Sequence, residues 1–110
     1  MKVFIVKPQE KPVVAEINPG LKALQEVVAG YVEVVYPFED HVALICNEEG
    51  KLLGLPLNRA LRTESGELYD IVAGTFILCG APPDSDHFTD LTSEQVETYL
   101  AYFALPEYYL

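Results

Sequence analysis

The chain has 110 residues, half of them hydrophobic, and a net charge of −10 from 17 acidic and seven basic side chains. This length predicts one domain, residues 1–110, and the composition is typical of a folded globular protein rather than a disordered one. The acidic excess excludes a general phosphate-backbone binder, whose surface would be basic. We therefore expect no direct binding of nucleic acid.

The charge is divided unevenly along the chain. Residues 1–62 carry all seven basic side chains and eight acidic ones, whereas residues 63–110 carry nine acids and no Lys or Arg. A charge of −9 in this acidic C-terminal half repels phosphate and attracts basic partners. The alternative is an ordinary solvated surface that keeps a small protein in solution, which is the commoner role of surface charge.

Nothing in the sequence indicates secretion or a membrane. The N-terminal segment MKVFIVKPQEKP lacks the apolar core and the cleavage site of a signal peptide, and no segment has the roughly 18 apolar residues of a membrane span. Cys46 and Cys79 each lie in an apolar run. Two buried free thiols fit a reducing cytoplasm, and a disulfide across adjacent strands is the less favoured alternative. We expect a cytoplasmic protein.

Runs of β-branched and aromatic residues predict six strands. They lie at residues 2–7, 13–17, 31–36, 41–47, 51–55 and within 68–79. The first two are expected to pair as a hairpin, and Gly50 is expected to give the turn before the fifth strand a positive φ. Asn58–Leu61 is expected to form one short helical turn, and Gly74 and Gly80 to mark a bulge or a close backbone approach.

Two helices are predicted, over about residues 19–29 and 93–104. Asn18 is suited to cap the first helix, and Thr92 with Gln95 forms the capping box of the second. Apolar side chains recur at helical spacing in both segments. The fold class is therefore α+β, with a mainly antiparallel or mixed sheet of about six strands and both helices packed on one face.

The loop before the second helix has the densest set of metal-ligand side chains. These are Asp84, Asp86, His87 and Asp90, in the sequence DSDHFTD. The loop fails the calcium-loop pattern, because Phe88, Thr89 and Gln95 occupy positions that need Asp or Asn, Gly and Glu. Zinc spacings, nucleophile elbows and phosphate loops are also missing. We expect no metal, no cofactor and no enzymatic activity.

Asn58 and Arg59 follow an apolar stretch and a proline in GLPLNRAL, at a predicted corner. The guanidinium of Arg59 can hold a carboxylate or a phosphate with two parallel hydrogen bonds. One interpretation is a ligand or partner contact. The other is an internal ion pair between Arg59 and an acid such as Asp70, and both interpretations stay open. Asn58, Arg59 and Asp70 are candidate ligand- or partner-binding residues.

The C-terminus is unusually aromatic. Tyr99 and Phe103 share the apolar face of the second helix and are expected in the core. Tyr102 lies off this face, and Tyr108 and Tyr109 follow the helix, so these three are candidate partner-binding residues. We favour a self-association surface that would make a homo-oligomer; the alternative is a tail folded back over the sheet.

The segments NEEGKLLGLPLNRAL and DIVAGTFILCG resemble a family of small domains of unknown function that recurs in phages, plasmids and conjugative elements of bacteria. The likeness extends over nearly the whole chain. Its motif positions are Asn47, Gly50, Gly54, Pro56, Asn58, Arg59, Gly74, Thr75, Phe76 and Gly80. The family implies no activity, and its glycines and proline favour backbone geometry over chemistry. Its genomic setting implies a modulator of host physiology or defence.

Three function classes follow. The first is a non-enzymatic accessory protein of a phage or mobile element that binds a host macromolecule, most simply a protein, through the acidic C-terminal half. The second is an oligomer that binds or sequesters a nucleotide-type small ligand, with Arg59 and Asn58 holding its phosphate. The third is a DNA mimic, which needs an extended acidic stripe and ranks last because the acids are mixed with aromatic residues.

Overall fold

The computed structural model describes residues 1–109 and contains seven strands and two helices. In chain order they are β1 (Lys2–Val6), β2 (Val13–Glu16), α1 (Leu21–Val28), β3 (Val32–Val35), β4 (Val42–Asn47), β5 (Leu57–Arg62), β6 (Leu68–Ala73), β7 (Phe76–Gly80) and α2 (Ser93–Tyr102). The α+β class is confirmed. The capping box of α2 is also confirmed, whereas α1 is capped by Gly20, whose N–H donates to Asn18 Oδ1 at 2.8 Å.

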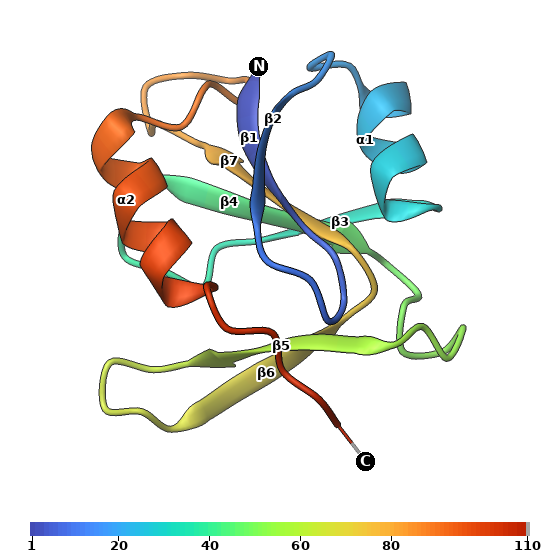
Figure 1. Cartoon of the computed structure of the whole chain (residues 1–110). Coiled ribbons are helices and arrows are strands. Elements are labelled where there is room, and N and C mark those ends of the chain that lie inside the picture. The colour runs from blue at the N-terminus through green and yellow to red at the C-terminus, as the bar shows by residue number, and fades with distance from the viewer. Residues whose placement is uncertain (110) are drawn as a thin grey trace.

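The strands form two antiparallel sheets. Five strands make the main sheet, in the order β2-β1-β7-β4-β3, and β5 and β6 make a separate two-stranded ribbon. The predicted hairpin of β1 and β2 is confirmed, with Phe4 opposite Val14. The ribbon crosses beneath the main sheet, and the chain beyond α2 passes over it (Figure 1). The structure thus has one strand more than predicted, and it divides the strands between two sheets.

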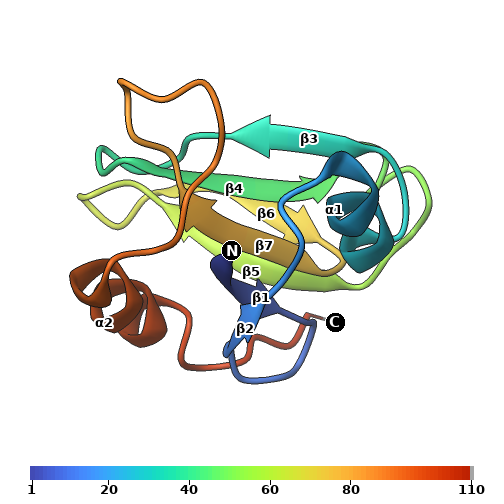
Figure 2. The same cartoon turned by 90° about the horizontal axis from the view of Figure 1, so that it is seen from above.

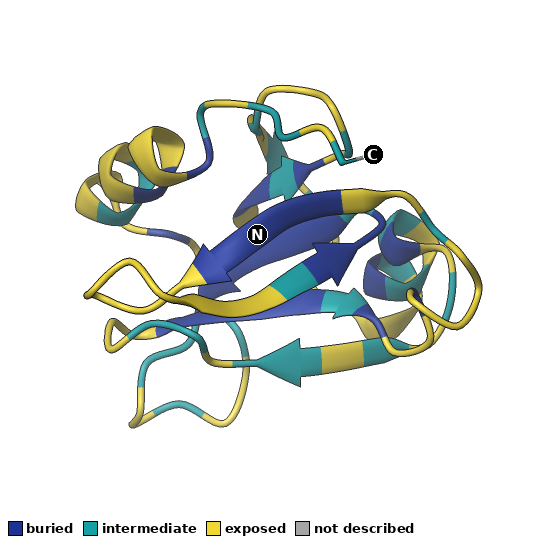
Figure 3. Cartoon of the chain, turned by 90° about the horizontal axis from the view of Figure 1, so that it is seen from below, coloured by how far each residue is buried: buried dark blue, intermediate teal, exposed yellow. Residues whose placement is uncertain are grey.

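The two helices lie on opposite faces of the main sheet, so the expectation that both cover one face is wrong. Side chains alternate between the two faces of each strand, and the faces have separate buried clusters. Val3, Ile45 and Ile77 pack with α1 on one face, while Leu44 and Leu78 pack with α2 and the ribbon on the other. Figure 2 shows α1 and α2 on different sides of the strands. Buried residues gather on the central strands (Figure 3).

The segment before the ribbon differs from prediction. Residues 51–55 form turns instead of a strand, because backbone hydrogen bonds of 2.8–3.2 Å join residues 49–55 to one another rather than to another strand. Leu52 and Leu53 are exposed, so this apolar run contributes little to the core. The strand comes later, as β5, and it includes residues 58–61, which were expected to form a helical turn. Strand β4 pairs with β3 and β7.

The predicted strand within residues 68–79 is two strands that belong to different sheets. Gly74 joins them with a φ of 83°, and its N–H donates to the carbonyl of Pro56 at 2.7 Å. This left-handed conformation suits glycine. Gly50, by contrast, does not have the expected positive φ. It is needed for a close approach, since a Cβ there would lie 2.8 Å from the carbonyl oxygen of Ala73.

Within residues 1–109, no helix has the length and apolar character needed to cross a membrane. Both cysteines are free thiols, as predicted. Cys46 faces the α2 side of the sheet and Cys79 the α1 side, so they cannot pair across the strands. Burial raises the pKa of the Cys46 thiol to about 11 and that of Cys79 to about 12, which makes both thiols poor nucleophiles.

Candidate functional site

Arg59 lies inside the molecule, with no exposed surface. Its five N–H groups all donate to nearby oxygens. The acceptors are the carbonyls of Phe103 (3.3 Å from Nε and 3.1 Å from Nη2), Glu10 (2.6 Å) and Asn58 (3.5 Å), and Asn58 Oδ1 (2.8 Å). Burial lowers the pKa of Arg59, against the opposing effect of the Glu107 carboxylate. The Arg59 side chain therefore has no free donor for a phosphate.

The arginine also stabilises the end of α2. Phe103 is the C-cap of that helix, where the last carbonyls carry partial negative charge. A guanidinium at this point completes hydrogen bonds that the helix leaves open. Because Glu10 belongs to the turn between β1 and β2, Arg59 connects three parts of the chain that are distant in sequence.

Asn58 is equally buried and equally satisfied. Its Nδ2 donates to the carbonyls of Val6 and Gly74, both at 2.8 Å, and its Oδ1 accepts from Arg59. These contacts join β1, the corner after β6 and the arginine. Within residues 1–109, no buried side-chain nitrogen or oxygen lacks a hydrogen-bond partner. A polar network so completely paired is typical of a structural element.

Asp70 does not pair with Arg59, so the internal ion pair, one of the two interpretations left open for Arg59, is not found within residues 1–109. Its Oδ1 instead accepts from Lys51 Nζ at 2.6 Å and from the Ile71 amide at 2.8 Å. Partial burial alone would raise the pKa of Asp70. The hydrogen bonds from Lys51 and from the Ile71 amide, together with the positive charge of Lys51, outweigh burial and lower that pKa. The Lys51–Asp70 pair is about half exposed and open to a ligand.

The predicted C-terminal residues lie along the outer edge of β5. The Tyr102 hydroxyl accepts from the Arg62 amide at 3.0 Å. Tyr109 donates to Glu107 Oε1 at 2.6 Å, and the Glu107 carboxylate accepts from the Ala60 amide at 3.2 and 3.3 Å. Tyr109 and Glu107 thus support a tail folded over the ribbon, which was the alternative reading of the aromatic residues. Tyr108 is 70% exposed and remains a candidate contact for self-association.

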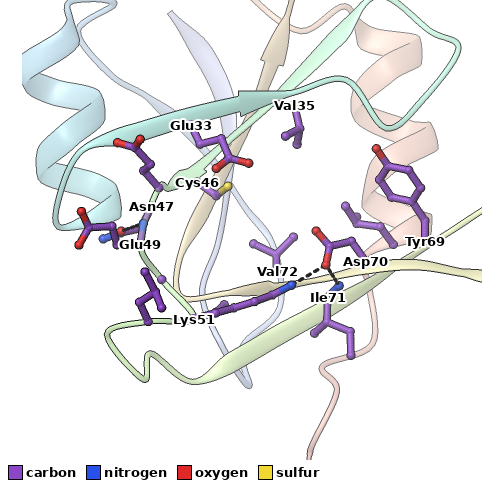
Figure 4. Close-up of a pocket in the computed structure, with 15 residues that line it drawn as sticks. Glu33, Val35, Cys46, Asn47, Glu49, Lys51, Tyr69, Asp70, Ile71 and Val72 are labelled. Carbon is purple, nitrogen blue, oxygen red and sulfur yellow. Dashed lines mark hydrogen bonds and ion pairs between the residues drawn. The ribbon is translucent and has the colours of Figure 1, made fainter.

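A cleft of about 450 Å³ opens where the main sheet and the ribbon separate. One wall is the face of β3 and β4, with Glu33, Val35 and Cys46. The other wall is β6, from which five consecutive residues, 69–73, line the cleft, and the turn after β4 closes one end. Figure 4 shows Asp70 between these walls, joined to Lys51 and to the Ile71 amide.

The cleft is acidic. Four carboxylates line it, from Glu33, Glu48, Glu49 and Asp70, against the single cation of Lys51. All four acidic residues are exposed, and its apolar lining includes Val35 and Leu61. Clefts lined by one sign of charge concentrate ligands of the opposite sign. The arrangement fits a ligand that combines positive charge with apolar surface, and it suits neither a phosphate nor an anionic nucleotide.

The polar groups of the loop of residues 84–90 form hydrogen bonds within the loop and with the start of β1. Asp90 Oδ1 accepts from the Lys2 amide at 2.7 Å, and His87 Nδ1 lies 3.1 Å from Asp86 Oδ1. In the described part of the chain, no three His, Cys, Asp or Glu side chains are grouped so that they could hold a metal ion.

Of the six predicted site residues, only Asp70 lines the cleft. Glu33, Glu48 and Glu49 were not predicted, although the sequence NEEGK concentrates acids at a turn. The cluster of acids in NEEGK is visible in the sequence. It indicates a cleft only once β6 is known to lie opposite the β3–β4 face. The pairing of β6 with β5 gives β6 this position. The sequence does not predict that pairing, because it predicts a strand at residues 51–55 instead.

A model of the family described as "Domain of unknown function (DUF3846)" matches residues 1–104. No curated protein and no solved structure matches the chain significantly. The matched range includes every strand, both helices and the whole cleft, whereas Glu107, Tyr108 and Tyr109 follow it.

Proposed function

The chain belongs to this family of domains of unknown function, and we propose that it is a non-enzymatic accessory protein whose acidic cleft binds a positively charged segment of another protein. The observation that carries the proposal is the cleft, with four carboxylates, one lysine and apolar walls between two sheets. Complementary charge steers partners and selects among them. The resemblance to domains of phages, plasmids and conjugative elements supports a bacterial host protein as the partner, which would place the complex in the cytoplasm.

The net charge predicts attraction for basic partners, and the cleft, rather than residues 63–110 alone, is where we expect this attraction to act. Glu33, Glu48 and Glu49 precede residue 63, so the cleft draws on both halves of the chain. The acidic C-terminal half contributes Asp70 to the cleft. Lys51 is the one basic residue in the lining, and it is already paired.

A nucleotide-binding oligomer receives less support. That hypothesis needs Asn58 and Arg59 as phosphate ligands, but both are buried and their donors are used within the protein. A DNA mimic needs carboxylates in a long stripe, whereas the cleft mixes its acids with Lys51, Tyr69 and apolar side chains. The geometry favours a protein partner over both.

Affinity capture from bacterial lysate, at low and moderate salt, tests the proposal with two triple variants of equal charge. The cleft variant carries Glu33→Gln, Glu49→Gln and Asp70→Asn. The control variant carries Glu26→Gln, Glu64→Gln and Glu97→Gln, at three exposed acids outside the cleft. Both variants should unfold at nearly the wild-type temperature, because exposed charges contribute little to stability.

The expected result is a captured protein, identified by mass spectrometry, with an exposed basic segment. In purified form it should bind the wild type and the control variant alike, and the cleft variant at least about tenfold more weakly, the loss of one or two charge contacts. The absence of any captured protein, or equal binding to all three forms, contradicts the proposal.

A further inference from the structure

We propose that the partner binds as an added β-strand along the open edge of β6, with its basic side chains directed at the cleft carboxylates. This inference rests on the proposed function and specifies its mode. It predicts that recognition needs the backbone of the partner segment as well as its positive charge. Strand addition of this kind takes affinity from main-chain hydrogen bonds and specificity from alternate side chains.

The outer edge of β6 has no strand partner within residues 1–109. The ribbon has only two strands, so β6 pairs with β5 on one side and faces the cleft on the other. In the described part of the chain, no backbone hydrogen bond outside the ladder involves residues 69–73. Unpaired strand edges readily accept another strand.

The register identifies which backbone groups face the cleft. Ala60 lies opposite Ile71, and the Ala60 amide donates to Glu107, away from β6. In an antiparallel pair, opposite residues either exchange both hydrogen bonds or direct both away from each other. The Ile71 N–H and C=O therefore point away from β5. The hydrogen bond from the Ile71 amide to Asp70 Oδ1 agrees with this orientation.

The two edges of the ribbon differ in what covers them. On β5, groups from a distant part of the chain, Tyr102 and Glu107, occupy the outward amides. On β6, the outward amide of Ile71 bonds only to the neighbouring Asp70 side chain, which is half exposed. A carboxylate on an exposed side chain can rotate away at small cost. The β6 edge is thus protected when alone and available to a partner.

A basic strand fits the groups that this edge presents. Its backbone would replace Asp70 at the Ile71 amide, and one of its cations would replace Lys51 at the freed carboxylate. Glu33 on the facing wall would meet the same row of side chains. Five residues of β6 line the cleft, which corresponds to about 17 Å of extended chain. A segment of five or six residues matches this length, and alternate lysines or arginines along it would all lie on one face of the added strand.

The test uses three capped hexapeptides with the sequence Lys-Val-Lys-Val-Lys-Val, measured by calorimetry against the full chain at low salt. The first is unmodified. The second carries a methyl group on the backbone nitrogen of each lysine, and the third carries one on the backbone nitrogen of each valine. The two methylated peptides are isomers of equal charge and mass. Methyl groups on one edge of an added strand remove its pairing donors, whereas methyl groups on the other edge face away.

Strand addition predicts that one isomer binds like the unmodified peptide and the other at least about tenfold more weakly, the effect of losing one or two hydrogen bonds. Equal affinities of all three peptides, reduced by the cleft variant, would overturn strand addition and leave the proposed function intact. If none of the peptides binds, both proposals fail.

A variant of the protein gives a second readout. Ile71→Pro removes the outward N–H without removing a ladder donor, and Ile71→Val keeps the amide as the matched control. The unmodified peptide should bind Ile71→Pro at least about tenfold more weakly than Ile71→Val. Equal binding to the two variants contradicts the inference. If Ile71→Pro fails to fold, as judged by circular dichroism, the isomer comparison decides the question alone.

Discussion

On the β5 side of the ribbon, Asn58 and Arg59 are buried and Glu107 and Tyr102 occupy the outward amides. On the β6 side, Asp70 and Lys51 form an exposed pair beside an open cleft. Both sides contain charged residues, but only one presents them to a ligand. A polar residue whose partners all come from its own chain belongs to the fold, whereas an exposed, exchangeable pair is the better candidate for binding.

The largest expected effect is at Arg59. Arg59→Met would leave the buried oxygens of Phe103, Glu10 and Asn58 without their donor. Unpaired buried groups are costly, and we expect a loss of about 3 kcal/mol or more in the free energy of unfolding. Urea denaturation measures it, with Arg62→Met at the exposed end of β5 as the control, expected within about 0.5 kcal/mol of wild type. A loss below about 1 kcal/mol at Arg59 would mean that the network is not structural.

A smaller effect is expected at Glu107. Glu107→Ala removes the acceptor of the Ala60 amide and of the Tyr109 hydroxyl, together with the charge that offsets Arg59. We expect a loss of about 1–2 kcal/mol in urea denaturation, because two hydrogen bonds to a carboxylate disappear. Peptide affinity at the cleft should not change. A parallel loss of peptide binding would show that the two edges of the ribbon are coupled.

Alkaline pH tests the same side of the ribbon. Burial, followed by the hydrogen bond to Glu107, raises the pKa of Tyr109 to about 12. The folded state therefore favours the protonated phenol, and its stabilisation is complete below about pH 10, the pKa of an unfolded tyrosine. It is lost as the pH rises through 12. Tyr109→Phe should flatten this part of the stability profile in urea titrations at pH 9 to 12. An unchanged profile would contradict the contact between Tyr109 and Glu107.

The smallest effect on stability is expected in the cleft. Lys51→Gln breaks an exposed ion pair, so unfolding should change by less than about 1 kcal/mol. The same change removes the only cation from the cleft lining, and the affinity for the Lys-Val hexapeptide should rise about fivefold. A decrease in affinity would mean that Lys51 itself contacts the ligand. This outcome would contradict the inference that a ligand cation takes the place of Lys51 at the Asp70 carboxylate.

The sequence predicts the elements whose signals are local. The capping box of Thr92 and Gln95, the paired β1 and β2, and the buried Tyr99 and Phe103 follow from spacing and propensity alone. The secondary structure predicted for residues 51–62 is wrong, because the apolar run at 51–55 has the composition of a strand although it forms turns. The strand that exists there begins at Leu57 and includes two polar residues, which only the tertiary network of Asn58 and Arg59 accommodates.

The site was less predictable than the fold for a related reason. Net charge along the chain indicated a basic partner, but it assigned the attraction to residues 63–110, whereas Glu33 and Glu49 meet Asp70 only after folding. Arginine often binds anions, so the sequence alone favours a ligand contact at Arg59 as much as a structural role. The full burial of Arg59, which no local pattern reveals, gives it a structural role.

A map of backbone amide shifts in the ¹⁵N-labelled full chain, recorded as the unmodified Lys-Val hexapeptide is added at low salt, locates the peptide on the protein. Strand addition in the cleft predicts shifts concentrated at β3, at the turn of residues 47–51 and at residues 69–73, with the largest change at the Ile71 amide. Shifts concentrated instead at α2 and residues 107–109, or no shift at millimolar peptide, would contradict the assignment of the cleft as the binding site.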